Sequence, residues 1–313
     1  MSMHIAVVDA VHPLLAERLV LAGHRVTAMH HLDDHALGQA LHDVQGIVVR
    51  SRLLSGELLR QAMSLCFVAR VGSGMENIDR SYCEAAGIQL MNSPEGNRDG
   101  VGEWCVGHLL TLLKHTHRAN SQVHAGLWDR EGNRGTDLFG RTVGIIGFGQ
   151  MGSAFAEKLA GFGVHILAHD KYRNAFPHAV EPAALRRIQE ESDVISLHLP
   201  LNVETRRYAN AAFFNALAKP VWFLNSSRGA VLDTAALLDA IDDGRVTGAA
   251  LDVLEYERPD LSSLDPTIEP ATQRRLLASE RVILTPHIAG VTHEGSVKMA
   301  RILADKIIAA FPC

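Results

Sequence analysis

The sequence predicts an α/β protein with two doubly wound parallel-sheet domains. Short apolar runs rich in β-branched residues alternate with helical patterns almost throughout the chain, and such alternation is typical of a parallel sheet with helices on both faces. The length of 313 residues is too great for one small core and comfortable for two domains. A turn-rich stretch from Asn92 to Gly100 separates a first series of elements from a second.

The first series occupies roughly residues 1–97. It opens with the strand "HIAVVDA" and with a helix that begins on Pro13 and is stopped by Gly23. Three further buried strands are expected at "GIVVRS", "CFVARV" and "GIQLMN", with helical stretches between the first pair and between the last pair.

A long helix is predicted next, from about Val101 to His124, because side chains that face a core recur there at helical spacing. These side chains are Trp104, Cys105, His108, Leu109, Leu112 and Leu113. The second series begins at Arg141, with strands expected at "RTVGII", "VHILAH", "DVISLHL", "VWFLNS", "GAALDV" and "RVILT". A final helix, His293 to Phe311, is expected to cross back to the first domain. We therefore expect one domain of residues 1–97 and 290–313, another of residues 98–289, and ligands in the cleft between them.

Composition excludes several classes of function. A formal net charge of -5 argues against a sequence-independent grip on nucleic acid. The start of the chain has no pattern of a secretory signal, and no apolar run approaches the roughly 20 residues of a membrane span. The four cysteines form no CxxC pair, which indicates free thiols and a cytoplasmic protein. The chain has 17 histidines, but no cysteine or carboxylate completes a plausible set of metal ligands with them, so no metal site is expected.

A glycine-rich turn in "RTVGIIGFGQMGSAFAEKL" has the strand–turn–helix context of a dinucleotide site. Gly147 would make the tight turn, Gly149 would let the backbone approach a pyrophosphate, and Gly152 would let the helix pack on the sheet. Gln150 and Met151 stand at the start of that helix, whose N–H groups would face the phosphates.

An acidic residue follows at the expected distance from this turn. The strand "VHILAH" ends at Asp170, and 170 − 147 = 23 is close to the usual separation. Asp170 would accept hydrogen bonds from the ribose hydroxyls of the adenosine, which favours NAD over NADP. Lys171 and Arg173 follow at once and would tolerate a 2′-phosphate, so the strictness of that preference stays open.

Three charged side chains in the second half of the chain supply an inventory for redox chemistry on a 2-oxo or 2-hydroxy acid. Arg228 stands in "NSSRG", Glu257 in "DVLEYERP" and His287 in "LTPHIAG". A guanidinium grips a carboxylate and polarises a carbonyl, and an imidazole moves a proton. A carboxylate orients that imidazole. Each residue alone has an ordinary structural explanation, such as a strand end, a solvated loop acid or a loop histidine.

With these flanks the chain resembles the D-isomer-specific 2-hydroxyacid dehydrogenases, and within them the short D-3-phosphoglycerate dehydrogenases. The resemblance spans about residues 47–295. It rests on "VGSGMENID", "NSPEGNRDGVGE", "GRTVGIIGFGQMG", "SLHLPLNVETR", "FLNSSRGAVLDTAALLDAI", "GAALDVLEYERP" and "ILTPHIAG". It implies a flavodoxin-like substrate domain and a Rossmann domain that binds NAD.

The resemblance also implies a role for each matching residue. Arg228 would bind the substrate carboxylate and polarise the C2 carbonyl, His287 would carry the hydroxyl proton, and Glu257 would hold the other imidazole nitrogen. His198, Pro200 and Ser227 would line the cofactor groove. Asp252 would hold the nicotinamide carboxamide. A loop with Ser73 and Gly74 would bind the substrate carboxylate through backbone N–H groups.

Two departures from the family pattern surround the acid. The usual "E-x-E-P" ending is "EYERP" here, with Arg258 ahead of Pro259. We keep Glu257 because its offset from Asp252 matches the family, with Glu255 as the alternative. The distance 287 − 257 = 30 is also longer than usual, and the excess, residues 258–275, is polar enough for a surface loop.

Substrate choice is expected to lie in the first domain. Arg50 and Arg52 would alternate along a strand and point to the same side, where two guanidiniums suit a phosphate, and Arg70 lies on the next strand. The alternative is that the first two lie beyond the strand end in solvent. The "RSR" pattern resembles phosphoglycerate dehydrogenases; Asn97 and Arg98 would add contacts.

The leading hypothesis is therefore NAD-dependent oxidation of 3-phospho-D-glycerate to 3-phosphohydroxypyruvate, the entry step to serine. A glyoxylate or hydroxypyruvate reductase and an erythronate-4-phosphate dehydrogenase are the rivals within the family. A dinucleotide-sensing scaffold without turnover is the alternative from another class.

Members of the family commonly dimerise through the long helix and arm of the cofactor domain, and residues 101–133 match that region. A homodimer is therefore expected. Four side chains would be excess apolar surface on a monomer, namely Trp104, Leu109, Leu113 and Trp128. Burial of these side chains within one chain is the alternative.

Overall fold

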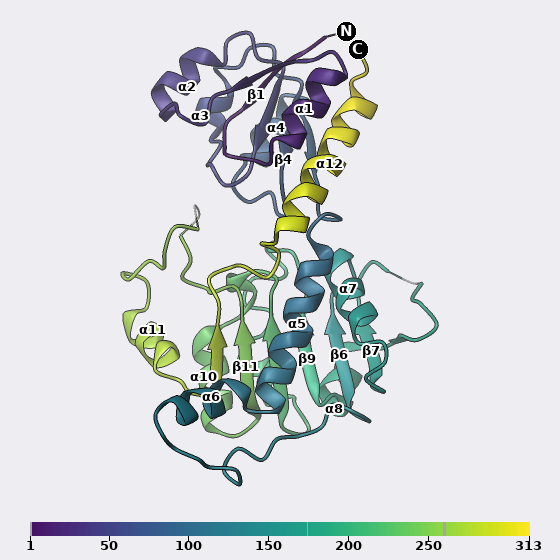
Figure 1. Ribbon diagram of the computed structural model, residues 1–313, viewed down its shortest axis with the longest axis vertical. Coiled ribbons are helices and arrows are strands. Elements are labelled where there is room, and N and C mark those ends of the chain that lie inside the picture. The colour runs from purple at the N-terminus through teal and green to yellow at the C-terminus, as the bar shows by residue number, and fades with distance from the viewer. Residues whose placement is uncertain (1, 174, 259–260) are drawn as a thin grey trace. The chain divides into compact units, whose positions relative to one another are not determined.

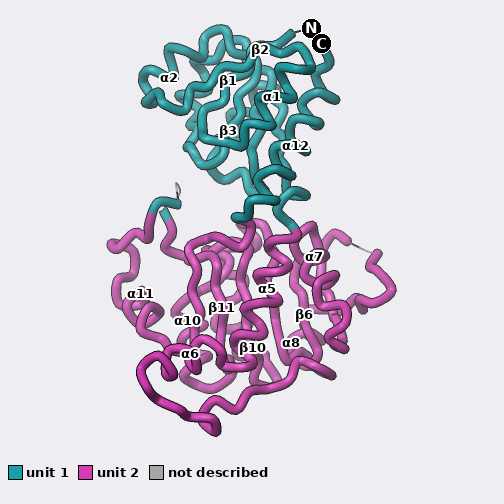
Figure 2. The backbone as a smooth tube through the Cα atoms, viewed as in Figure 1, with its two compact units in different colours: residues 1–98, 258–262, 291–313 teal, residues 99–257, 263–290 magenta. Residues whose placement is uncertain are grey.

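The computed structural model describes residues 2–173, 175–258 and 261–313. The chain divides into two compact units, one of Met1–Arg98, Arg258–Ser262 and Val291–Cys313, the other of Asp99–Glu257 and Ser263–Gly290 (Figure 2). Each unit contains one parallel sheet with helices on both faces (Figure 1). The predicted class, two doubly wound α/β domains, is confirmed.

The first unit has a five-stranded sheet in the order β2-β1-β3-β4-β5, which is the flavodoxin-like order. Its strands are β1 (His4–Val7), β2 (Arg25–Ala28), β3 (Gly46–Val49), β4 (Phe67–Arg70) and β5 (Gln89–Asn92). Its helices are α1 (Leu14–Leu21), α2 (Asp34–Ala40), α3 (Gly56–Leu59), α4 (Arg80–Ala85) and α12 (His293–Ala310).

Two apolar clusters cover the two faces of this sheet, because successive strand residues point to opposite sides. Ile5 and Val7 of β1 pack with α1 and α12, which lie side by side, whereas Ala6 packs with α2, α3 and α4. The predicted final helix is therefore part of the first unit's core (Figure 1).

The second unit has a seven-stranded sheet in the order β12-β11-β10-β9-β6-β7-β8. Its strands are β6 (Thr142–Ile146), β7 (His165–His169), β8 (Glu181–Pro182), β9 (Val194–Leu197), β10 (Val221–Asn225), β11 (Val246–Leu251) and β12 (Val282–Leu284). The chain starts at β6, winds outward to β8, and then crosses back to β9. The order reverses between β6 and β9, and the carboxyl ends of strands at such a switch point form the usual ligand site.

Helices cover both faces of the seven-stranded sheet. One face carries α5 (Arg98–Leu113) and α7 (Gln150–Lys158), which pack on Val143 and Ile145. The other face carries α8 (Leu185–Glu191), α9 (Ala211–Asn215) and α10 (Thr234–Asp242), which pack on Ile146 and Phe223. The remaining elements of this unit are α6 (Thr116–His124), the short 3-10 helix η1 (Gly229–Val231) and α11 (Pro270–Leu277).

The predicted continuous helix from Val101 to His124 is wrong. The structure has two helices, α5 and α6, because His115 adopts the left-handed conformation with φ 52° and interrupts the hydrogen-bond ladder. The excursion expected as a loop contains α11, whose first residue is Pro270, a favourable residue at a helix start. Residues 259 and 260, including the displaced proline, lie outside the described residues.

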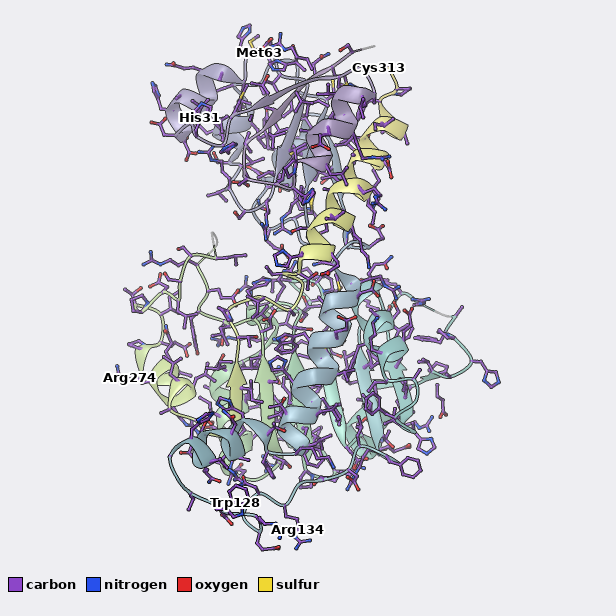
Figure 3. All side chains as sticks on the ribbon, in the orientation of Figure 1. His31, Met63, Trp128, Arg134, Arg274 and Cys313 are labelled. Atoms are coloured by element: carbon purple, nitrogen blue, oxygen red, sulfur yellow. The ribbon has the colours of Figure 1, made fainter. Side chains whose placement is uncertain are left out.

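Three of the four side chains expected as excess apolar surface are buried within the chain. Leu109, Leu113 and Trp104 face the sheet from α5, and Trp104 is only 9% exposed. Trp128, in the segment after α6, is 77% exposed (Figure 3). Its apolar neighbours in the sequence, Val123 and Leu127, are each 52% exposed.

Candidate active site

Three charged side chains follow three neighbouring strands of the seven-stranded sheet. Arg228 follows β10, Glu257 follows β11 and His287 follows β12, and these strands pair in parallel. The carboxyl ends of parallel strands meet at one edge, so the fold places all three residues at the same edge of the sheet.

Glu257 and His287 are in direct contact. The Nδ1 atom of His287 lies 3.0 Å from Oε2 of Glu257, and the two side chains are 30% and 18% exposed. The other carboxylate oxygen of Glu257 accepts the backbone N–H of Leu254 at 2.6 Å. An ionised carboxylate only accepts, so the imidazole carries its hydrogen on Nδ1 and leaves Nε2 available for proton exchange.

The neighbouring acid, Glu255, is engaged elsewhere. Its Oε1 atom accepts from the Arg207 guanidinium at 2.9 Å, and its Oε2 atom accepts from the backbone N–H of Thr234 at 3.1 Å. Of the two candidate acids, Glu257 is therefore the one that contacts His287.

The turn that carries His287 is held by Asp252, which is only 1% exposed. The carboxylate accepts from the Thr285 hydroxyl at 2.6 Å and from the backbone N–H groups of Ile288 and Ala289 at 2.8 Å each. The backbone N–H of His287 donates to the Asp252 carbonyl at 2.8 Å. His287 itself has a left-handed backbone with φ 56°, a conformation that a non-glycine residue keeps only when its surroundings hold it.

The Arg228 turn is shaped by Asn225 and Gly229. Asn225 Oδ1 accepts from the Ser227 N–H at 3.0 Å and from its hydroxyl at 2.7 Å, while Asn225 Nδ2 donates to the Arg228 carbonyl at 3.1 Å. A Cβ atom on Gly229 would lie 1.9 Å from the Leu254 carbonyl oxygen, so only glycine fits. This close approach fixes the Arg228 turn against the loop that carries Glu257.

The glycine turn follows β6, beside the point where the strand order reverses. Gly147 has φ +90°, and a Cβ atom there would lie 2.4 Å from the His198 carbonyl oxygen. Gly149 occupies the N-cap of α7, and a Cβ atom on it would meet no described atom within 4 Å. An anion can therefore approach the backbone and the start of α7 at this point.

His198 lies directly beneath the glycine turn. Its Nε2 atom lies 2.8 Å from the Ser196 hydroxyl, and its Nδ1 atom is buried without a partner among the described residues. Burial lowers the pKa of His198 to about 3, so the imidazole is neutral. Pro200, a little further along, is exposed.

Asp170 follows β7 and is tied to the glycine turn. Its Oδ2 atom accepts from the Phe148 N–H at 2.7 Å, and its Oδ1 atom accepts from the N–H groups of Tyr172 and Arg173 at 2.8 and 3.0 Å. Burial acts to raise the pKa of Asp170, but these backbone donors and the Arg173 charge outweigh burial and lower it. The carboxylate is therefore ionised in neutral solution.

Both cations that follow Asp170 are engaged within the chain. Arg173 donates to the carbonyl oxygens of Phe148 at 2.7 Å and Ala175 at 2.9 Å, and its guanidinium lies over the Phe148 ring. Lys171 pairs with Glu204 at 2.6 Å.

An open pocket of about 320 Å³ adjoins Asp170. Apart from that acid and Arg173, its lining is apolar: Ala168, Phe176, Pro182, Ala183 and Ala184. Flat apolar walls beside a carboxylate fit an adenosine, with the rings against the walls and the ribose hydroxyls at Asp170. The residues present therefore fit a dinucleotide that runs from this pocket to the glycine turn.

The residues expected to bind substrate cluster in the first unit. Arg70 donates to the Arg50 carbonyl at 3.0 Å and to the Gly74 carbonyl at 2.6 Å. The Ser73 hydroxyl donates to Asn97 Oδ1 at 3.0 Å. Arg70 thus connects the loop after β3 with the loop after β4.

The prediction that the guanidiniums of Arg50 and Arg52 point to the same side is wrong. Strand β3 ends at Val49, and the backbone N–H groups of residues 50, 51 and 52 turn inward to one oxygen of Asp9, at 2.7, 2.8 and 2.9 Å. The Arg52 guanidinium donates to the Leu32 carbonyl and lies 3.4 Å from Asp34, whereas Arg50 is exposed. Asp9 was not anticipated, although its place just after β1 marks it as an edge residue.

Among the described residues, no group of three or more His, Cys, Asp and Glu side chains is arranged to hold a metal ion. Within the same residues no helix has the length and apolar character needed to cross a membrane.

Comparison with known proteins agrees with this geometry. Residues 106–289 match the NAD binding domain of the D-isomer specific 2-hydroxyacid dehydrogenases. The chain is 33% identical over 278 residues to the hydroxypyruvate reductase of Thermotoga maritima, with 88% of each chain covered. It is 31% identical over 272 residues to the D-3-phosphoglycerate dehydrogenase of Bacillus subtilis, which covers 86% of this chain and 50% of that one.

The solved structures lead to the same class. A glyoxylate/hydroxypyruvate reductase from Sinorhizobium meliloti, NADPH-dependent and in complex with citrate, superposes with a TM-score of 0.82. It is 29% identical and the match covers 98% of this chain and 95% of that one. The fold and the site define an oxidoreductase with a dinucleotide-binding domain. The chain belongs to the D-isomer-specific 2-hydroxyacid dehydrogenase family, with its NAD-binding domain at residues 106–289. It spans about half the length of the D-3-phosphoglycerate dehydrogenases of Bacillus subtilis and Rattus norvegicus.

Proposed function

We propose that this protein transfers hydride between NAD and C2 of a D-2-hydroxy acid. The observation that carries the proposal is the 3.0 Å contact of His287 with Glu257 at the strand edge that also bears Arg228. A base needs one imidazole nitrogen fixed by a carboxylate and the other available, and a guanidinium at the same strand edge can bind the substrate; these are the demands of moving a proton at a substrate hydroxyl.

Each residue has a role in the proposed reaction. Arg228 binds the substrate carboxylate with its rigid fork of donors and polarises the C2 carbonyl. During oxidation His287 accepts the hydroxyl proton on Nε2, and during reduction it returns that proton to the carbonyl oxygen. Glu257 holds the Nδ1 hydrogen and stabilises the imidazolium that forms. NAD, when bound, supplies the hydride acceptor at its nicotinamide.

The same proposal assigns NAD to residues of the second unit. The α7 start with Gly149, Gln150, Met151 and Gly152 would hold the pyrophosphate, and Asp170 would hold the ribose. Asp252 already accepts three hydrogen bonds, which leaves its carboxylate about one more acceptor position for a carboxamide.

NAD rather than NADP is the expected partner of this site. The ionised Asp170 would repel a 2′-phosphate, and Arg173 and Lys171 are committed to other groups. Titration of the intrinsic fluorescence with each cofactor tests this preference. Equal affinity for NADH and NADPH would remove the argument.

For the substrate we propose 3-phospho-D-glycerate, oxidised to 3-phosphohydroxypyruvate, with Arg50 as the phosphate contact. The support is the exposure of Arg50, whose carbonyl accepts from the same Arg70 guanidinium that donates to Gly74, together with the similarity to D-3-phosphoglycerate dehydrogenases. The phosphate would be held by one arginine, since Arg52 is engaged with Asp34.

Reduction of hydroxypyruvate or glyoxylate is the second candidate. It is favoured because Arg50 and Arg52 do not form the expected pair of guanidiniums. The Asp9 carboxylate, which accepts from the backbone N–H groups of residues 50–52, would also repel a substrate phosphate at this position. The similarity to a hydroxypyruvate reductase adds to this support.

The two candidates are separated by measuring kcat/KM for hydroxypyruvate and 3-phosphohydroxypyruvate. For the phosphorylated substrate alone, Arg50→Ala should lower kcat/KM by about 10- to 150-fold, because a hydrogen bond to a charged group contributes about 1.5–3 kcal/mol. Arg80→Ala, another exposed arginine of the first unit, is the matched control. Equal losses for both substrates, or none, would reject the phosphate contact and favour the reductase.

We also propose a homodimer that covers Val123, Leu127 and Trp128. The support is their exposure on one short segment, which is unusual for apolar side chains of this size.

A further inference from the structure

Helix α5 lies over the seven-stranded sheet (Figure 1). Trp104 stands on this helix, far in sequence from the proposed catalytic residues, and is buried in the apolar cluster between helix and sheet. Its indole nitrogen lies 3.1 Å from the Thr285 hydroxyl oxygen, although the two residues are 181 positions apart in the chain. The indole ring is fixed in turn by His108, which stacks on it with 4.2 Å between ring centroids.

The direction of the hydrogen bonds in this chain of contacts is forced. An indole N–H only donates, so the Thr285 oxygen must accept from Trp104. The single hydrogen of that hydroxyl then points to Asp252 Oδ1, 2.6 Å away. Asp252 acts as the acceptor in all of these contacts, because its other two partners are backbone N–H groups.

Asp252 connects these side chains to the turn that carries His287 through hydrogen bonds. Its oxygens accept the N–H groups of the two residues that follow His287, and its carbonyl accepts the N–H of His287 itself. The left-handed φ of 56° at His287 needs such support from its surroundings. A continuous series of hydrogen bonds therefore joins Trp104 to the turn that carries His287.

We propose that Trp104 is a positioning residue of the active site, which holds the His287 turn through Thr285 and Asp252. The inference rests on the proposed function, since it concerns the residue assigned as proton carrier. Trp104 touches neither substrate nor cofactor in this role. Its effect should fall on kcat, because the step that needs an aligned Nε2 is proton transfer.

A double-mutant cycle tests the chain in the full-length protein. Trp104→Phe removes the N–H and keeps an aromatic ring, and Thr285→Val removes the hydroxyl at nearly constant shape. Each should lower kcat about 5- to 20-fold, with KM for NADH and for the 2-oxo acid changed less than about threefold. The double variant should be no worse than Thr285→Val alone, because both changes break one chain. Thr285→Ser, which keeps the hydroxyl, should restore most of the activity.

Trp222→Phe is the matched control. Its indole packs against the same apolar cluster and donates no hydrogen bond to a described residue. It should leave kcat within about twofold of the wild type by the same reasoning.

A second readout does not depend on turnover. Hydrogen exchange followed by mass spectrometry reports the amides of Ile288 and Ala289, which donate to Asp252. Exchange over residues 285–290 should quicken in Trp104→Phe and in Thr285→Val, and should stay unchanged in Trp222→Phe. If the wild-type protein turned over no 2-oxo acid, the proposed function would fail while this measurement still tested the chain. Additive losses in the cycle, a rise in KM alone, or unchanged exchange in both variants would overturn the inference.

Discussion

Replacing Glu257 by Gln is the sharpest single perturbation of the proposed site. The carboxylate supplies two acceptor oxygens, one to the His287 Nδ1 hydrogen at 3.0 Å and one to the Leu254 N–H at 2.6 Å. A carboxamide has one carbonyl oxygen and a group that donates. One of the two donors therefore faces another donor, or the imidazole changes tautomer and places its hydrogen on Nε2.

The size of the effect follows from the contact. At 3.0 Å and an effective dielectric constant of ~20, two unit charges attract by roughly 5 kcal/mol. The side chains are 30% and 18% exposed, so solvent screens part of this attraction. A net loss of about 1.5–3 kcal/mol, typical of a hydrogen bond to a charged group, corresponds to about a 10- to 150-fold fall in the rate of the step that forms the imidazolium.

Stopped-flow reduction of NAD in a single turnover with a D-2-hydroxy acid such as 3-phospho-D-glycerate measures this step directly, because His287 gains its proton in that direction. Glu257→Gln should lower the rate constant by the amount above and leave the NADH dissociation constant within about twofold. Glu255→Gln is the comparison, because that acid pairs with Arg207 and should affect melting temperature more than rate. A Glu257→Gln rate within threefold of the wild type, or a larger loss in Glu255→Gln, would refute the assignment of the acid.

Two further predictions concern stability and assembly. Burial lowers the pKa of His198 to about 3 from 6.5, so the unfolded chain takes up a proton below about pH 6.5 that the folded chain refuses. This contribution to the free energy of unfolding is therefore complete above pH 6.5 and is lost as the pH drops toward 3, by up to about 1.4 kcal/mol per pH unit. Denaturant titrations from pH 7 to 5 should show that the free energy of unfolding falls less steeply in His198→Gln than in the wild type. An equally steep fall would contradict the burial argument. The exposed His31, labelled in Figure 3, is the control through His31→Gln. Trp128→Ser should raise the dissociation constant of the proposed dimer at least tenfold in sedimentation equilibrium, since a tryptophan buried at the centre of an interface is often a hot spot that contributes about 2 kcal/mol or more. An unchanged association state would show that this segment is not part of the interface.

Features coded in short motifs were predictable from the sequence. The glycine turn, Asp170 and the trio at the strand edge each follow a strand, and parallel pairing brings such positions to one edge. The alternation of strands and helices predicted that both sheets are parallel, whereas their strand orders were implied only by the family resemblance.

Features that depend on tertiary partners were not predictable. Nothing near Arg52 in the sequence reveals that Asp34 and the Leu32 carbonyl hold its guanidinium, or that Asp9 draws in the backbone where the strand was expected to continue. The left-handed His115 carries no local signal of a helix break, because histidine is not a helix-breaking residue.

The support of the His287 turn was also invisible in the sequence. Asp252 was expected only as a cofactor contact, whereas the structure gives its oxygens three partners within one turn. The contact from Trp104 to Thr285 joins residues 181 positions apart, and no periodicity or motif connects them.

In the proposed reaction His287 carries the proton while hydride moves to or from C2 of a D-2-hydroxy acid. The most direct measurement compares single-turnover NADH oxidation by the wild type and by His287→Gln, with the NADH dissociation constant determined for both. The rate constant of His287→Gln should be lower than that of the wild type by about 100- to 10,000-fold, and its NADH dissociation constant should be unchanged. A His287→Gln rate within threefold of the wild type would contradict this role of His287.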